Sequence, residues 1–198
     1  MKDILLKSLI FFGFIALSSG CTKDFDDINT NPNAPTAVNS GLLLPQIERD
    51  MMGSLLGETW GIGNIVIQHT AKNQFVNEDR YLWGDLTSIW NNVYDNMRDV
   101  QNIIAQSEAS GEKNYQGIAL VLKSWMFSLA TDAYGDVPYS QATLAKAGQN
   151  FPAYDPQEQI YNGILADLKK ANDLLGASGE VVAGDVIFGG DAAKWKKL

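Results

Sequence analysis

Residues 84–134 read GDLTSIWNNVYDNMRDVQNIIAQSEASGEKNYQGIALVLKSWMFSLATDAY, and this stretch decides the fold. Apolar residues recur at three- and four-residue steps in its first half, which predicts an amphipathic helix over about 84–107. The polar residues 110–113 interrupt the pattern, and a second apolar stripe follows. Two long amphipathic helices joined by a short polar loop are expected to pack antiparallel as a hairpin. The two stripes are Leu86, Ile89, Val93, Met97, Val100 and Ile104, then Tyr115, Ile118, Ala119, Leu122, Met126, Leu129, Ala130 and Ala133.

Helical patterns also lie on both sides of this hairpin. Residues 39–73 have helical potential, with breaks or bends expected near Pro45, Gly57 and 61–63. A further helix is expected to end at Gly176. Its expected buried face consists of Ile160, Ile164, Leu168, Ala171 and Leu175.

The start of that helix carries a pattern typical of helix capping. Asp155 is expected to accept hydrogen bonds from first-turn amides, Pro156 to take the first helical position, and Glu158 to complete a capping box.

Asp191 resembles the N-cap of one more helix, which stops after about two turns. Because Trp195 and Leu198 would then be exposed, we expect a chain that is truncated at its C-terminus. No strand pattern of any length occurs. The sequence therefore predicts a mostly α fold of helical hairpins with long irregular loops, over a domain comprising residues 39–198.

Residues 1–20 have the features of an export signal that ends at Cys21. Lys2 and Lys7 give a basic start, residues 8–17 are largely apolar, and residues 18–20 are small. Cys21 is the single cysteine of the chain, so a disulfide within the chain is excluded. The apolar run is too short to span a membrane. We interpret residues 1–20 as a lipoprotein signal peptide and Cys21 as the lipidation site, which carries a diacylglyceryl group and a further acyl chain such as palmitate.

Residues 21–38 are read as a polar tether, because acidic residues follow Cys21 and the run NTNPNAP at 29–35 cannot hold a helix. The formal net charge of −8 makes nucleic acid a poor partner. The ordinary balance of apolar and charged residues favours a globular chain.

No catalytic constellation, metal site or cofactor motif emerges. His69 is the single histidine, and a role in packing or at the surface outweighs catalysis. Asp132 and Asp136 form the one tempting carboxylate pair, but helix capping or a turn explains them equally well.

The segment 131–142, TDAYGDVPYSQA, resembles the helix-to-loop signature of the SusD/RagB nutrient-binding lipoproteins. Residues 31–35 (NPNAP), 89–94 (IWNNVY) and 190–198 (GDAAKWKKL) agree with the family in order and spacing. By their chemistry, the signature residues read as structural rather than as ligand contacts. They are Asp132, Tyr134, Gly135, Asp136, Pro138 and Tyr139.

The resemblance implies a scaffold of helix pairs related to tetratricopeptide repeats. It also implies a lipid-anchored outer-membrane protein that faces the cell exterior. Such a protein binds oligosaccharides or peptides without chemistry and delivers them, as a lid, to a SusC-type TonB-dependent transporter.

The loop at residues 75–83 is the predicted ligand site. Its polar groups can bond hydroxyls or carboxylates, and its aromatic rings supply stacking faces; alternatively, Tyr81 and Trp83 anchor the start of the next helix. The predicted site residues are Asn77, Asp79, Arg80, Tyr81 and Trp83.

Two other functions stay open at this point. One is a secreted glycan-active hydrolase, and the other is a structural helical adaptor of the transporter. Stacking aromatics and acidic groups serve glycan and peptide ligands alike, so the sequence does not choose between them.

Overall fold

The computed structural model describes residues 38–85 and 87–198. The predicted signal peptide (1–20), the lipidation site Cys21 and the tether up to residue 37 lie outside the described residues, as does Leu86. The described part is mostly helical and has no strand, apart from an isolated antiparallel bridge between Val137 and Asp155. The predicted mostly α class is confirmed.

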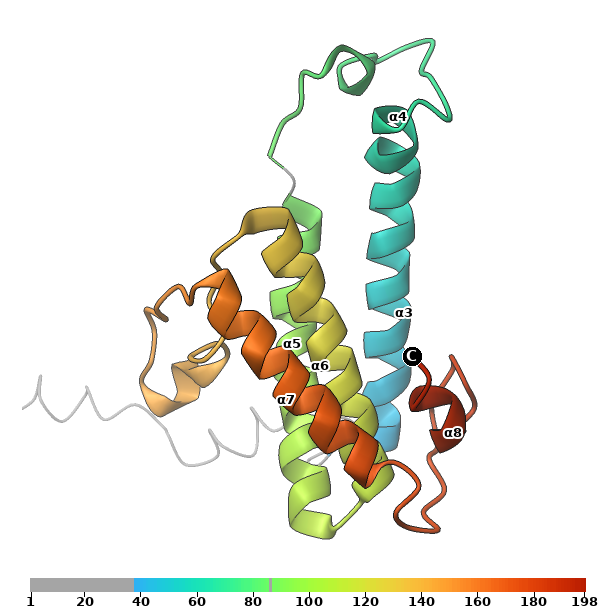
Figure 1. The fold of residues 1–198 in the computed structure, drawn as a ribbon, viewed down its shortest axis with the longest axis vertical. Coiled ribbons are helices and arrows are strands. Elements are labelled where there is room, and N and C mark those ends of the chain that lie inside the picture. Colours follow the sequence, from blue (N-terminus) through green and yellow to red (C-terminus); the bar gives the residue numbers. More distant parts are fainter. Residues whose placement is uncertain (1–37, 86) are drawn as a thin grey trace, which may run out of the picture. The chain divides into compact units, whose positions relative to one another are not determined.

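Three long helices pack side by side as the centre of the described domain (Figure 1). The predicted hairpin consists of α5 (Thr87–Ser110) and α6 (Lys113–Tyr134). Gly111, with φ of 77°, makes the tight turn between them, where the polar interruption was expected. Helix α7 (Gln157–Leu174) packs along α6 on the other side.

Helix α3 (Ser40–Glu58) packs along α5, and Asn39 caps it by accepting from the Leu42 N–H. The expected breaks at Pro45 and Gly57 are wrong, because α3 runs through both. Pro45 lacks an N–H for the Gly41 carbonyl, which instead lies against Gly184.

The expected irregularity near residues 61–63 appears as a change of helix type. The chain continues from α3 as a π-helix, η1 (Thr59–Gly63), and a short turn, α4 (Asn64–Val66). The helical potential expected up to residue 73 ends earlier, since Gln68 has φ of 60°.

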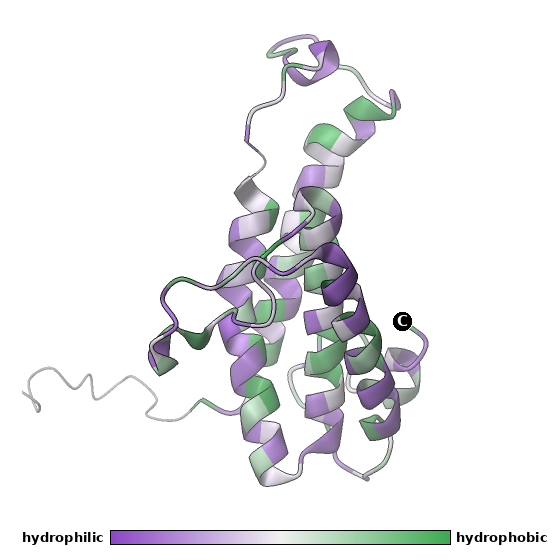
Figure 2. Cartoon of the chain, turned by 60° about the vertical axis from the view of Figure 1, so that its left-hand side comes forward, coloured by the Kyte–Doolittle hydropathy of each residue, from purple (hydrophilic) through white to green (hydrophobic). Residues whose placement is uncertain are grey.

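A single apolar core lies between these helices. Figure 2 shows apolar and polar residues in alternating bands around the helices, as amphipathic helices require. The largest fully buried apolar side chains come from α3, α5, α6 and α7, from the residue that follows α7 and from the C-terminal turn α8 (Ala192–Trp195). They are Leu44, Ile47, Met97, Ile103, Ile118, Leu122, Met126, Phe127, Ile160, Leu175 and Trp195.

Two expectations about α7 are wrong. Asp155 does not cap α7: Pro156 is the N-cap residue, and the first helical N–H, of Gln157, donates to Asp136 instead. Leu168, expected in the buried face of α7, is exposed.

The C-terminal residues give one confirmed and one wrong expectation. Asp191 caps α8 as predicted by accepting from the N–H groups of Ala193 and Lys194. Trp195, expected to be exposed, is 1% exposed, because its ring packs edge-on against Phe188.

Candidate functional site

The predicted ligand loop lies between α4 and α5, beyond the end of α3 (Figure 1). It contains a 3₁₀ turn, η2 (Glu78–Arg80). Together with the end of α4, the loop encloses a hollow of about 390 Å³, within the size range of small-molecule sites. The residues that line it are Ile65, Gln68, His69, Thr70, Ala71, Glu78, Asp79 and Tyr81.

Polar contacts inside the loop fix its shape. The Asp79 carboxylate accepts from the backbone N–H of Lys72, at 3.2 and 3.3 Å for its two oxygens. The Lys72 ammonium lies 2.6 Å from Glu78, and its hydrogen bond lowers the pKa of that carboxyl. The indole N–H of Trp83 donates to the Glu78 carbonyl at 3.4 Å. The loop thus has internal bonds that hold its polar and aromatic groups in place.

Two aromatic rings are presented to solvent at the end of the loop. Tyr81 is 60% exposed and Trp83 is 50% exposed, with ring centroids 5.9 Å apart and planes at 50°. Tyr81 has φ of 57°, in the left-handed region that a bulky residue rarely adopts. Exposed rings in a strained turn can stack against apolar faces of a ligand.

The structure brings together part of the predicted residue set. Asp79 and Tyr81 line the hollow, and Trp83 contacts Tyr81 beside it. Asn77 and Arg80 are exposed on the same turn but do not line the hollow.

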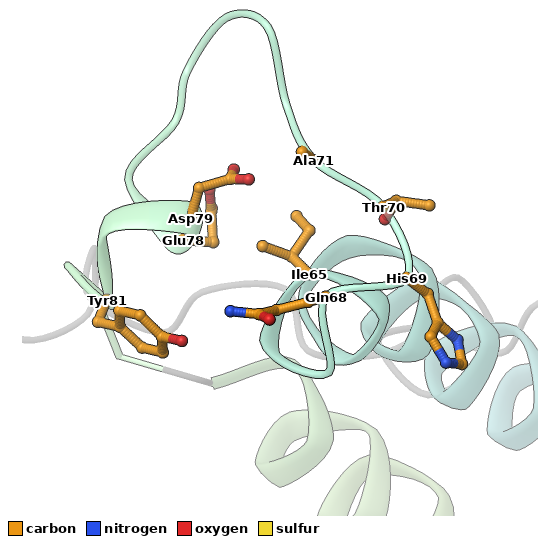
Figure 3. Close-up of a pocket in the computed structure, with 8 residues that line it drawn as sticks. All are labelled: Ile65, Gln68, His69, Thr70, Ala71, Glu78, Asp79 and Tyr81. Carbon is orange, nitrogen blue, oxygen red and sulfur yellow. The ribbon is translucent and has the colours of Figure 1, made fainter.

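Sequence reasoning missed the contribution of residues 68–71. A helix continuing to residue 73 would place His69 on a helical face, whereas the chain leaves the helix at Gln68 and residues 68–71 line the hollow instead. Figure 3 shows the Tyr81 hydroxyl directed toward the Gln68 amide, while the His69 ring points away from the hollow. No sequence signal marks this departure, because Gln68 takes a positive φ without being glycine or asparagine.

A second, aromatic hollow of about 590 Å³ lies where α5 begins. The Trp90 ring lies edge-on to Tyr134 at 5.5 Å and stacks on Tyr154 at 6.2 Å, with 27° between the two planes. Tyr154 is exposed, while Trp90 is partly buried. The lining residues are Gly84, Asp85, Thr87, Trp90, Tyr134 and Tyr154.

The first half of the signature segment makes contacts within the domain. The Tyr134 hydroxyl accepts from the backbone N–H of Trp90 at 3.2 Å. The Asp132 carboxylate accepts from the Tyr161 hydroxyl at 2.6 Å. Gly135, with φ of 76°, ends α6. These contacts tie the end of α6 to α5 and α7.

The second half of the signature fastens the following loop. Asp136 accepts from the Gln157 N–H at 3.0 Å, and the Pro138 carbonyl accepts from the Tyr94 hydroxyl at 2.7 Å. Burial raises the pKa of Tyr94, which keeps this donor protonated.

Tyr139 in that loop is partly buried against α6 and α7. Its ring lies edge-on to Phe127 at 4.7 Å, and its hydroxyl lies 3.4 Å from Asp167. Burial first, and the Asp167 charge second, raise the pKa of Tyr139. Asp132 and Asp136, the carboxylate pair considered for catalysis, accept from Tyr161 and Gln157 of α7.

Within residues 38–85 and 87–198, no cluster of three or more His, Cys, Asp or Glu side chains is placed to hold a metal ion. Nor does that part of the chain contain a helix with the length and apolar character needed to cross a bilayer.

Helical hairpins that carry long irregular loops define the class of protein, and solved structures share it. The chain is similar to a SusD homologue from Bacteroides fragilis, with 28% identity, a TM-score of 0.65 and coverage of 82% of this chain and 33% of that one. It is also similar to a chitin-binding protein, with 32% identity, a TM-score of 0.68, and coverage of 80% and 36%. A SusD/RagB family protein from Bacteroides thetaiotaomicron shares the fold at 22% identity, with a TM-score of 0.62 and coverage of 81% and 36%.

Residues 32–198 match the SusD-like family model, described as starch-binding and associating with the outer membrane. The chain belongs to this SusD-like family. It spans about a third of the length of the solved structures that it matches. No curated protein matches it.

Proposed function

We propose that this chain acts in the capture of oligosaccharides at the outer membrane, with the loop at residues 75–83 as part of the binding surface. The observation that carries the proposal is the match of residues 32–198 to a family described as starch-binding. The chitin-binding relative points to the same class of ligand. The exposed rings of Tyr81 and Trp83 supply the stacking faces that sugar rings require.

The proposal extends to the localisation and the partner of the protein. Residues 1–20 act as a signal peptide, Cys21 carries the lipid anchor, and residues 21–38 form the tether on the cell exterior. Several acyl chains on one residue give stable anchoring, because each buried CH₂ contributes about 0.8 kcal/mol. Captured ligand passes to a SusC-type TonB-dependent transporter, which the protein covers as a lid without performing chemistry.

Calorimetric titration with malto- and chito-oligosaccharides tests the ligand proposal. Replacing both Tyr81 and Trp83 with alanine is expected to lower the affinity at least tenfold, since stacking on each ring contributes about 1 kcal/mol. Phe151→Ala is the matched control, because Phe151 is 90% exposed and lies in a different loop. Unchanged affinity in the double variant, with an intact helical circular dichroism spectrum, would remove this loop from the binding surface.

The anchor is tested on the exported protein. Mass spectrometry is expected to find a mature N-terminus at Cys21 that carries acyl chains, and Cys21→Ser is expected to move the protein from the detergent-rich to the aqueous phase. A free thiol on an uncleaved chain would contradict the proposed lipid anchor and localisation.

The two alternatives make different predictions. A glycan-active hydrolase shortens oligosaccharides during incubation, which chromatography detects. A structural adaptor co-purifies with the transporter, as the nutrient-binding protein does, but gives no heat with glycans. Binding of peptides in place of glycans in the same calorimetry would keep the capture function and change its ligand class.

A further inference from the structure

The segment after α7 is held by hydrogen bonds to Tyr115 of α6 and Glu48 of α3. The Tyr115 hydroxyl donates to the Ala183 carbonyl at 2.9 Å and accepts from the Ala183 N–H at 2.8 Å. Gly184, with φ of 85°, lies so close to the Gly41 carbonyl that a Cβ would collide with it. The next contact is made by a carboxyl group, since the Val186 N–H donates to Glu48 Oε2 at 2.6 Å.

Asp185 organises the rest of this segment. Its carboxylate accepts from three backbone N–H groups and from the indole N–H of Trp195 at 2.7 Å. Burial raises the pKa of Asp185, but these hydrogen bonds outweigh it and leave the pKa below its ordinary value. Asp185 is therefore ionised at neutral pH. The three backbone donors are Ile187, Phe188 and Gly190.

Glu48 is in the opposite situation. It is 0% exposed, and its Oε1 has no hydrogen-bond partner among the described residues. Burial, together with the charge and side chain of Asp185, raises the pKa of Glu48 to about 8, although the Val186 N–H opposes the shift. A buried carboxyl in this position keeps its proton at neutral pH.

The other charged and titratable groups around Glu48 are already paired or neutral. Its neighbours on α3, Arg49 and Asp50, bond to Gln46 at the surface. Lys194 of α8 pairs with Asp191. In residues 38–85 and 87–198, no lysine, arginine or histidine forms an ion pair with Glu48 or Asp185.

Helices α5 and α6 pack against α3, and none of their described lysines or arginines forms an ion pair with Glu48 or Asp185. Helix α6 contributes the Tyr115 hydroxyl, bonded to Ala183, and α5 contributes the Asn92 amide, bonded to the Asp50 carbonyl.

We infer that Glu48 holds a proton in the folded chain, and that this proton keeps residues 184–195 fastened onto α3. The Glu48 carboxyl is fully buried and its Oε2 accepts from the Val186 N–H, while four donors hold Asp185, one residue earlier in the segment, as a carboxylate. When Glu48 loses the proton to solvent, two like charges lie side by side in a buried position, which favours detachment of the segment. The fold thus contains a pH-sensitive latch between α3 and the segment that ends in α8.

The direction of the pH effect follows from linkage. In the detached state Glu48 is hydrated and its pKa returns to about 4.5. Between that value and about 8, detachment releases a proton, so the detachment constant rises with pH by up to tenfold per pH unit. Below the lower value and above the upper value, the constant is flat.

Hydrogen exchange followed by mass spectrometry tests the latch on the full chain. After correction for intrinsic rates, the protection of residues 184–195 is expected to fall as pH rises through this window. Glu48→Gln keeps the shape of the protonated acid and its donor, so its protection is expected to stay high and flat. Glu158→Gln, which removes an exposed carboxyl on α7, is expected to retain the slope of the parent chain.

Infrared spectroscopy gives a readout that needs no detachment. The parent chain is expected to show the carbonyl band of a protonated carboxyl at pH 7, titrating with a pKa of about 8, and Glu48→Gln is expected to lack it. An identical pH slope in Glu48→Gln would overturn the inference. So would the absence of a protonated carboxyl in the parent chain at pH 7, whether or not the variant folds.

Discussion

The carboxylate of Asp155 accepts a hydrogen bond of 2.7 Å from the backbone N–H of Ser140, fifteen positions earlier in the chain. The same carboxylate accepts from the Tyr139 N–H at 2.9 Å, the Ser140 hydroxyl at 2.8 Å and the Gln159 amide at 2.9 Å. One buried side chain therefore closes the long loop that begins with the signature segment.

Replacing Asp155 with alanine is expected to lower the free energy of unfolding by about 2–4 kcal/mol, because several donors lose a charged acceptor at once. Urea denaturation followed by circular dichroism measures the change. Asp173→Ala is the matched control, since Asp173 is exposed on the last turns of α7, and its effect is expected to stay within about 0.5 kcal/mol. Equal effects at the two positions would contradict the role of Asp155.

The contribution of Asp155 is also expected to depend on pH. Burial raises the pKa of Asp155, but the hydrogen bonds from Ser140 and Tyr139 outweigh it and leave the pKa below the ordinary 3.8. The stabilisation is therefore present above pH 3.8 and is lost as pH falls through the lower folded-state value. The difference in melting temperature between the parent chain and Asp155→Ala is expected to shrink in acid, and a difference that is constant down to pH 2 would refute this.

Gly163 on α7 allows close packing against the Tyr139 ring. A Cβ at this position would collide with the ring and hydroxyl of Tyr139. Although alanine favours a helix over glycine by about 1 kcal/mol, Gly163→Ala is expected to destabilise the domain by about 1–3 kcal/mol through overpacking.

Gly53 lies in the interior of α3, as Gly163 does in α7, but its surroundings are open. A Cβ there meets nothing within 4 Å, so Gly53→Ala is expected to stabilise the domain by about 0.5–1 kcal/mol. Chemical denaturation measures both variants: a stabilising shift for Gly163→Ala would show that packing at Gly163 is not limiting, and a destabilising shift for Gly53→Ala would contradict the open environment of Gly53.

Trp195 combines a buried ring with the hydrogen bond to Asp185. Trp195→Phe keeps most of the apolar surface and removes the indole donor, and it is expected to cost about 1–3 kcal/mol. Trp195→Ala also leaves a cavity and is expected to cost about 3–5 kcal/mol. Thermal unfolding orders the variants, and equal losses for phenylalanine and alanine would assign the whole effect to the hydrogen bond.

The sequence predicted the hairpin well because its information is local. The stripes of α5 and α6 repeat over many turns, and Gly111 has a conformation that glycine alone adopts freely. The capping of α7 was mispredicted because a local motif cannot show a competing distant partner. Asp155 bonds to Ser140, and Asp136 serves the helix start in its place.

The candidate site was partly predictable for a related reason. Exposed aromatic and polar residues in one loop, such as Tyr81 and Asp79, are visible in the sequence, and both line the hollow. Gln68 and His69 were not predicted, because their place depends on where the chain leaves a helix.

The sequence by itself determined the helical class, the pairing of α5 with α6 and the family signature, since each depends on spacing along the chain. Only the tertiary structure decided that Trp195 is buried and that the buried Glu48 carboxyl bonds to the Val186 N–H. The physical reason is that burial and the pKa of a carboxyl depend on neighbours from separate elements of the fold, and these neighbours leave no periodic trace in the sequence.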